Sequence, residues 1–246
     1  MGTHIDSLEF VAFDTETTGA SAVADALVEV AAVRFTLEKG PLAYFQTLVN
    51  PRRPIPPFVT GIHGITDDMV AASPTIDKVL PHFFRFLEGA VPVAHNARFD
   101  VDFIAVPSLR AGIDLPQVDV LDSCRFSRRA LPGLPSYSLT NLTKSLDVPT
   151  SVHHRAQADS VSCMEVFRIA VERSVGRDAD WLELMAVHGA TIPFHRSVEV
   201  LTEVDARLEP LLSAIRDRRR IWIEYAGGYG PREITPHTLY AKGGGR

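Results

Sequence analysis

Two acidic side chains, two residues apart, are the first feature of this sequence that could do chemistry. Asp14 and Glu16 follow the apolar run FVAF, and in an extended chain residues i and i+2 point to the same face. Two carboxylates about 4 Å apart repel each other by about 4 kcal/mol at an effective dielectric constant of about 20. A proton or a hard divalent cation with oxygen ligands would relieve that repulsion. A strand end with two solvated acids is the alternative, and the pair alone does not decide.

Two further motifs carry acids in similar settings. HNARFD ends at Asp100 after a short apolar segment, and HHRAQAD ends at Asp159 at the start of a long amphipathic segment. Singly, either acid could cap a helix or be favoured by the helix dipole, and His154 could be a surface residue. Together, four acids and a histidine are the set that two-metal phosphodiester hydrolysis needs, with the histidine as general base.

Alternating strands and helices must position these motifs. Apolar patterning predicts five core strands, at residues 10–14, 27–35, 43–51, 91–96 and 118–121. Helical spacing predicts helices at residues 75–89, 97–112, 138–147 and 155–174. The second and third strands form a hairpin, because the turn sequence EKGP separates them. The pattern indicates an α/β fold with a mixed sheet, in which ligands collect at strand ends.

A change of charge character near residues 175–180 predicts a domain boundary. We expect one domain at 1–175 and a second region at 176–246, with a helix at 198–219 and strands at 220–225 and 232–240. Residues 207–246 carry eight lysines or arginines against four acids, although the whole chain has a net charge of −5. The residues before 207 therefore carry an excess of acids. Such an acidic region can still bind nucleic acid if divalent cations lie between its carboxylates and the phosphates.

The overall composition is that of a soluble globular protein, with 46% hydrophobic and 22% charged residues in a chain of 246. No apolar run approaches the roughly 18 residues of a membrane span, and the first residues lack a secretory pattern. A cytoplasmic location without membrane contact is therefore expected. The two cysteines, Cys124 and Cys163, form no CxxC pair and no zinc-ligand spacing.

The three motifs FDTETTG, HNARFD and HRAQAD resemble, in order, those of the DnaQ-like DEDDh 3′–5′ exonuclease superfamily, which includes the proofreading epsilon subunit of bacterial DNA polymerase III. The resemblance spans about residues 8–175 and includes GIHGIT and SYSLTNLTKSLDVP between the motifs. It implies an RNase H-like, five-stranded mixed sheet flanked by helices. It also implies two Mg²⁺ or Mn²⁺ ions and the release of nucleoside 5′-monophosphates from 3′ ends.

The resemblance also implies a role for each matching residue. Asp14, Glu16 and Asp159 would hold the catalytic ion, and Asp14 would bridge to a second ion held by Asp100. His154 would be the general base, because the HxAxxD spacing selects it over His153. The implied substrate contacts are Thr17, Thr18, His63, Asn96 and Phe99.

The leading hypothesis is a proofreading or repair exonuclease that acts on single-stranded or frayed DNA 3′ ends. A polymerase subunit is a candidate partner. An exoribonuclease of the same superfamily is the first alternative, since no single residue decides whether a 2′-hydroxyl is accepted. The second alternative is a non-catalytic regulatory protein that binds nucleic acid through its tail. Residues 214–240 resemble the start of a WYL domain, a small β-rich module of bacterial regulators.

Overall fold

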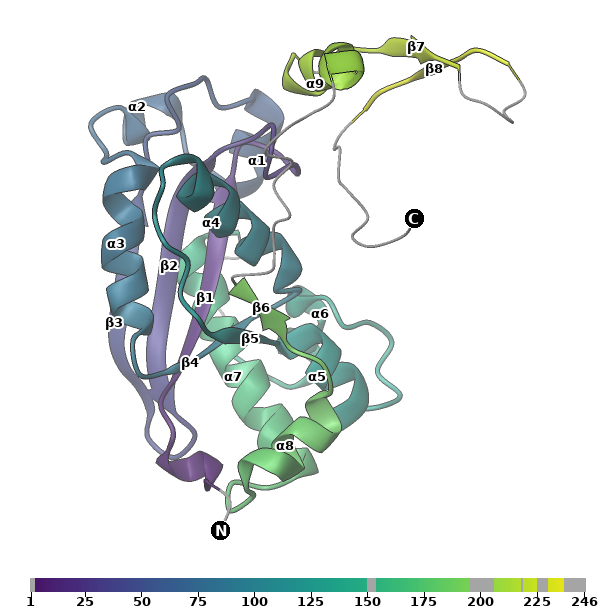
Figure 1. The fold of residues 1–246 in the computed structure, drawn as a ribbon. Helices are drawn as coiled ribbons and strands as arrows, with labels where there is room; N and C mark the ends of the chain where they lie inside the picture. The colour runs from purple at the N-terminus through teal and green to yellow at the C-terminus, as the bar shows by residue number, and fades with distance from the viewer. Residues whose placement is uncertain (1–2, 150–153, 195–205, 218, 225–229, 237–246) are drawn as a thin grey trace.

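A computed structural model describes the chain except for residues 1–2, 150–153, 195–205, 218, 225–229 and 237–246 (Figure 1). A mixed sheet of six strands, in the order β3-β2-β1-β4-β5-β6, forms its centre. The strands are β1 (Phe10–Thr17), β2 (Leu27–Thr36), β3 (Gly40–Leu48), β4 (Val91–Ala94), β5 (Asp119–Asp122) and β6 (Ile192–Pro193). The mixed sheet is confirmed, but it has one strand more than predicted. The extra strand β6 has only two residues, too few for a period-2 pattern to reveal it.

Helices cover both faces of this sheet (Figure 1). Buried side chains of α5, α6, α7 and α8 pack on one face, and those of α3 and α4 pack on the other. The helices are α1 (Pro57–His63), α2 (Asp67–Val70), α3 (Ile76–Leu87), α4 (Arg98–Arg110), α5 (Ser123–Ala130), α6 (Leu139–Ser145), α7 (Ala156–Ser174) and α8 (Trp181–His188). Helix α1 begins at Pro57, since a proline costs little in the first helical turn.

The alternation of side chains along β1 assigns its residues to these two layers. Phe10 and Ala12 belong to the core on the α7 side, where the Phe10 ring lies 5.5 Å from that of Phe167. Val11 and Phe13 belong to the core on the α3 and α4 side. Because side chains alternate in a strand, the even-numbered acids that follow face α7.

The extent of β1 corrects one prediction. The strand was expected to end at Asp14, but it continues to Thr17, so that Asp14 is paired with Ala31 and Glu16 with Glu29 of β2. On its other side, β1 pairs with β4 only as far as Ala12. At Asp14 and Glu16, β1 is therefore hydrogen-bonded to β2 along one edge and is no longer paired with β4 along the other. Ligands of α/β sheets bind where neighbouring strands separate in this way.

The C-terminal region contains α9 (Glu209–Arg216) and an antiparallel pair formed by β7 (Ile221–Ile223) and β8 (Arg232–Ile234). The predicted helix over 198–219 lies partly outside the described residues; its described part contains a short 3-10 turn, Ala206–Leu208, followed by α9. The predicted boundary after residue 175 stays a prediction. Beyond it in the sequence, Leu184 of α8 is buried in the core and β6 pairs with β5.

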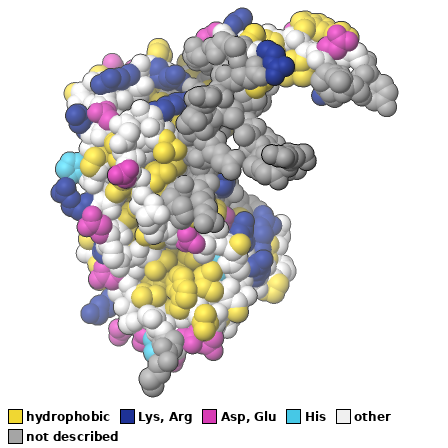
Figure 2. All heavy atoms as spheres, viewed as in Figure 1, with side chains coloured by type: hydrophobic (Ala, Val, Ile, Leu, Met, Phe, Trp, Pro, Cys, Tyr) yellow, Lys and Arg dark blue, Asp and Glu magenta, His cyan; other side chains and the backbone are white. Residues whose placement is uncertain are grey.

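The surface drawn in Figure 2 carries acidic and basic side chains interspersed, with hydrophobic side chains gathered over its lower half. This face is therefore not a uniformly basic surface of the kind that binds nucleic acid by charge alone. Within the described ranges, no helix combines the length and the apolar character needed to cross a membrane.

Candidate active site

Three carboxylates predicted from the sequence meet between β1 and α7. Oxygen atoms of Asp14, Glu16 and Asp159 all lie within 4.8 Å of one another. The first two come from β1, and Asp159 comes from the first turn of α7, where the helix dipole favours a negative charge. All three side chains are half-buried. A half-buried, all-oxygen ligand set at this separation fits Mg²⁺ or Mn²⁺.

Proximity and burial make these acids hard to ionise in the absence of a cation. The pKa of Asp14 is raised well above its ordinary value, first by burial and then by the charges of Asp100, Asp159 and Glu16. Burial, followed by the charges of Asp159 and Glu29, raises the pKa of Glu16 to about 8. The metal-free site therefore holds protons near neutral pH, and a divalent cation would displace them.

Asp100 approaches the same site from the opposite layer. It lies buried in the first turn of α4 and outside the group of three, but its charge raises the pKa of Asp14 more than any other charge does. The hydroxyl of Thr15 donates a hydrogen bond of 2.7 Å to Asp100 Oδ1. Burial raises the pKa of Asp100 to about 7, although the Thr15 bond acts against it. Successive residues of β1 thus contact acids on both faces of the sheet.

His154 lies exposed immediately before α7. Its backbone N–H donates to Asp159 Oδ2 at 2.9 Å, so the third motif orients its own acid. Its φ of +62° is a left-handed conformation that costs a non-glycine residue about 1 kcal/mol or more. The competing residue, His153, lies outside the described part of the chain.

Thr17 and Thr18, predicted to contact substrate, shape the turn that follows β1. Both are buried; the Thr17 hydroxyl donates to the Gly19 carbonyl at 2.5 Å, and the Thr18 N–H donates to the Ala26 carbonyl at 2.8 Å. A Cβ atom on Gly19 would collide with the Asp25 carboxylate, so that side chain would have to move. Their contact with a nucleotide stays a prediction.

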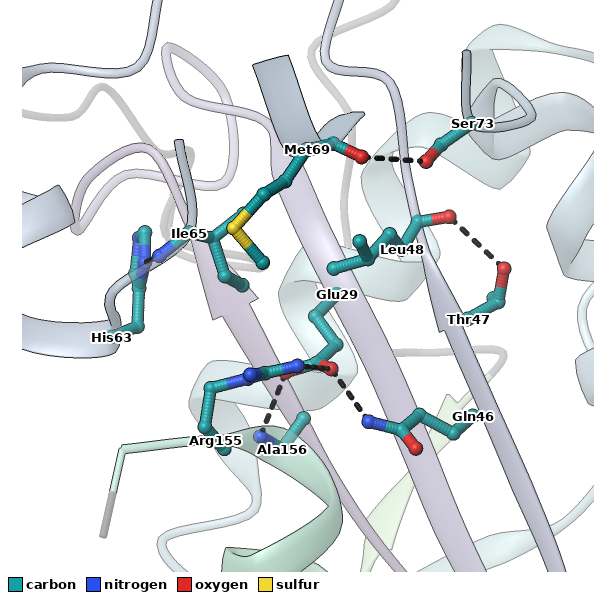
Figure 3. Close-up of polar contacts among 10 residues, drawn as sticks. All are labelled: Glu29, Gln46, Thr47, Leu48, His63, Ile65, Met69, Ser73, Arg155 and Ala156. Atoms are coloured by element: carbon teal, nitrogen blue, oxygen red, sulfur yellow. Dashed lines mark hydrogen bonds and ion pairs between the residues drawn. The ribbon is translucent and has the colours of Figure 1, made fainter. Parts of the chain in front are cut away.

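The other three predicted contact residues lie in two places. His63, at the end of α1, is buried and accepts the Ile65 N–H at Nδ1 (3.0 Å; Figure 3), so its Nε2 carries the proton. Burial lowers the pKa of His63, and a backbone interaction with Thr17, which opposes that shift, places the two residues side by side. Asn96 and Phe99 flank the start of α4, four residues and one residue before Asp100.

A buried ion pair that was not predicted from the sequence lies beside these acids. Glu29 is completely buried on β2, directly across from Glu16, and its carboxylate is bound by the Arg155 guanidinium. Burial acts to raise the pKa of Glu29, but hydrogen bonds from Arg155 and Gln46 outweigh it and lower the pKa below its ordinary value. One signal in the sequence could have identified this residue, because Glu29 is the only polar residue in the apolar run LVEVAAV.

Fold and site together define an RNase H-like architecture: a mixed sheet between helical layers, with carboxylates gathered between its central strand and α7. Residues 11–167 match the family model RNase_T, described as exonuclease. The chain therefore belongs to this exonuclease family.

Its relatives include proteins named as DNA polymerase III or as its epsilon subunit. The chain is 40% identical over 164 residues to DNA polymerase III subunit epsilon of Treponema pallidum. The aligned region covers 66% of this chain and 76% of the relative. It is 41% identical over 165 residues to the PolC-type DNA polymerase III of Caldanaerobacter subterraneus, covering 67% of this chain but only 12% of that polymerase. The chain thus spans a small part of the longer relatives.

Solved exonucleases share the fold. A structure of exonuclease X in complex with 5′ overhanging duplex DNA is 29% identical, with a TM-score of 0.57, over 74% of this chain and 99% of that chain. Exonuclease I, at 21% identity and a TM-score of 0.61 over 73% of this chain and 43% of that chain, supports the fold alone. The family match ends at residue 167, so the WYL-like reading of residues 214–240 stays a prediction.

The raised pKa values predict how pH and metal affect stability. Without divalent cations, the contribution of Asp100 and Glu16 to the free energy of unfolding should fall as pH rises from about 4 to about 8, because folding moves the pKa of Asp100 from 3.8 to about 7 and that of Glu16 from 4.5 to about 8. In that range the native state binds more protons than the unfolded state, which makes the slope negative. Added Mg²⁺ should therefore stabilise the protein more at about pH 8.5 than at about pH 5.

Urea unfolding in EDTA and in Mg²⁺ at these two pH values would measure the effect. The double variant Asp14→Asn/Glu16→Gln is the control, and it should show a flatter pH dependence and a smaller Mg²⁺ effect. A metal-free wild-type protein whose stability changed with pH in the same way as that of the double variant would contradict the prediction.

Proposed function

We propose that this protein is a metal-dependent 3′–5′ exonuclease that releases nucleoside 5′-monophosphates from DNA 3′ ends. The observation that carries the proposal is the convergence of Asp14, Glu16 and Asp159 within 4.8 Å. Three carboxylates that repel one another are unfavourable in a structural role, and their order in the chain is that of the exonuclease motifs. Membership of the exonuclease family supports an enzyme rather than a regulatory scaffold.

In this proposal, the acids divide between two divalent cations, Mg²⁺ or Mn²⁺. Asp14, Glu16 and Asp159 would hold one, and Asp14 and Asp100 would hold the other. When bound, such a pair of ions supplies a nucleophilic oxygen at neutral pH and stabilises the oxygen that leaves. The rigid mount for the first pair of ligands is β1, which is hydrogen-bonded to β2 along its whole length.

His154 is the proposed general base, which takes the proton of the attacking water. Its position supports this role, since its backbone contacts Asp159 while its side chain is exposed. An exposed imidazole at this position would be able to take a proton from a water molecule in the site and return it to solvent. The backbone interaction with Asp159 keeps that side chain at the edge of the site.

The proposed substrate is a single-stranded or frayed DNA 3′ end. The exonuclease X structure contains DNA, and the epsilon relative is named as a polymerase subunit, which makes a polymerase a proposed partner here. Thr17, Thr18, His63, Asn96 and Phe99 are the proposed contacts to the terminal nucleotide. The cytoplasmic location expected from the sequence also stays a prediction.

A pair of labelled oligonucleotides tests the proposed polarity and substrate. With Mg²⁺, a 3′-labelled single strand should release labelled mononucleotide at once, whereas a 5′-labelled strand should shorten stepwise. EDTA should abolish both reactions, because it removes the divalent cations that the proposed mechanism requires. An RNA of the same sequence is the matched substrate, and faster digestion of the RNA would favour the exoribonuclease alternative. Early release of the 5′ label would contradict the polarity.

A further inference from the structure

We propose that Glu29 is a positioning residue that acts through Arg155 to hold His154 in place for catalysis. The inference rests on the proposed function, because it assigns a purpose to a buried ion pair beside the same site. Glu29 lies on β2, whereas Arg155 immediately follows His154 and precedes α7. Neither belongs to the group of three carboxylates.

The carboxylate of Glu29 is fully hydrogen-bonded (Figure 3). Arg155 donates to both of its oxygens, from Nη2 at 2.8 Å and from Nε at 3.0 Å. Gln46 of β3 donates from Nε2 at 2.8 Å, and the backbone N–H of Ala156 donates at 3.1 Å. One buried acid thus joins two strands to the first residue of α7. The negative charge also suits the N-terminus of that helix.

These bonds fix the chain on one side of His154. The conformation of this residue is unfavourable, with a φ of +62°, and such a conformation persists where its surroundings determine it. The His154 N–H is held by Asp159 at 2.9 Å, and the next residue is held through its side chain by Glu29. Two attachments, one to a proposed metal ligand and one to the sheet, therefore restrict the direction of the His154 side chain.

The ion pair also explains why an acid across from Glu16 stays out of the carboxylate group. Each oxygen of Glu29 already accepts two hydrogen bonds. A carboxylate has about four acceptor positions, so this one has none left for a cation. Arg155 is bidentate on Glu29, a geometry that a lysine could not reproduce. The pair is thus built to orient a segment rather than to bind metal.

A double-mutant cycle tests this assignment. Glu29→Gln keeps the side-chain shape but removes the charge that holds Arg155. It should lower kcat on single-stranded DNA by about 10–100-fold, the usual effect of losing a group that orients a site residue, and change KM by less than about threefold. In a His154→Ala background, the same change should lower kcat by less than about threefold, because the side chain being positioned is already absent.

A control variant tests whether breaking any ion pair of α7 has the same effect, and a second variant replaces Glu29→Gln if that protein does not fold. Glu165→Gln breaks another ion pair of α7, with Arg168 at 3.0 Å, and should leave kcat unchanged. If Glu29→Gln does not fold, Arg155→Lys takes its place, since Arg155 is partly exposed. In the metal-free protein, amide exchange at His154, followed by NMR, should be faster in either variant than in Glu165→Gln.

The outcomes separate two kinds of failure. An active Asp14→Asn variant would remove the proposed function and this inference with it. If Asp14→Asn is inactive but the effects of Glu29→Gln and His154→Ala multiply, only the positioning role is wrong. Unchanged kcat in Glu29→Gln, or unchanged amide exchange at His154, would also overturn it.

Discussion

Asp14→Asn is expected to lower kcat on single-stranded DNA by about 10³-fold or more. Asp14 is the acid whose pKa responds to all three other proposed ligands, so it lies at the centre of the site. Charge stabilisation by bound metal is worth several kcal/mol, and each 1.4 kcal/mol or so is a factor of ten in rate. Asparagine keeps the shape and one oxygen but removes the negative charge.

The same substitution should have the opposite effect on stability. In EDTA near pH 8, removing one of several mutually repelling carboxylates should raise the free energy of unfolding. Single-turnover assays, calorimetric titration with Mn²⁺ and urea unfolding would together measure rate, binding and stability. Asp119→Asn is the matched control, because Asp119 is an exposed acid at the start of β5. An equal loss of activity in that control, or full activity in Asp14→Asn, would contradict the expected role.

The second large effect is expected for His154→Ala, which should lower kcat by about 10²–10⁴-fold, the usual contribution of a general base. Binding of Mn²⁺ should persist, because no imidazole nitrogen belongs to the carboxylate group and the backbone N–H that binds Asp159 remains. A lower kcat with unchanged Mn²⁺ binding would identify His154 as a general base, whereas loss of Mn²⁺ binding would identify it as a metal ligand. Calorimetry with Mn²⁺ and single-turnover kinetics on the same preparation would measure both.

Backbone conformation complicates this test, and a second substitution addresses it. His154 has a positive φ, which alanine adopts reluctantly and asparagine adopts more readily. His154→Asn should therefore fold at least as well as His154→Ala and still lack the base. His82→Ala, on the exposed face of α3, is the control histidine. Loss of Mn²⁺ binding in both His154 variants would instead make this residue a ligand.

Much of the site could be predicted from local sequence. Asp14 and Glu16 share a face because strand side chains alternate, and Asp159 opens a helix because an amphipathic pattern starts there. Each inference needs only a short window of residues. The order of the three motifs then supplied the resemblance to exonucleases, and the family match confirmed it.

Contacts between distant residues could not be predicted in this way. The Thr15–Asp100 bond joins residues 85 positions apart, and the Glu29–Arg155 pair joins residues 126 apart. The hydrophobic pattern of a short segment does not predict which residue of β2 lies across from Glu16. That pairing depends on strand register and on where α7 crosses the sheet.

The sequence by itself determined which chemical groups are present, on which kind of element each lies, and which face of its strand or helix each occupies. Tertiary structure alone decided that β1 continues through both acids, that Asp100 of α4 bonds to Thr15 of β1, and that Glu29 pairs with Arg155. The physical reason is that backbone periodicity acts over a few residues, whereas the repulsion, burial and hydrogen bonding that set these pKa values act between segments that only folding brings together.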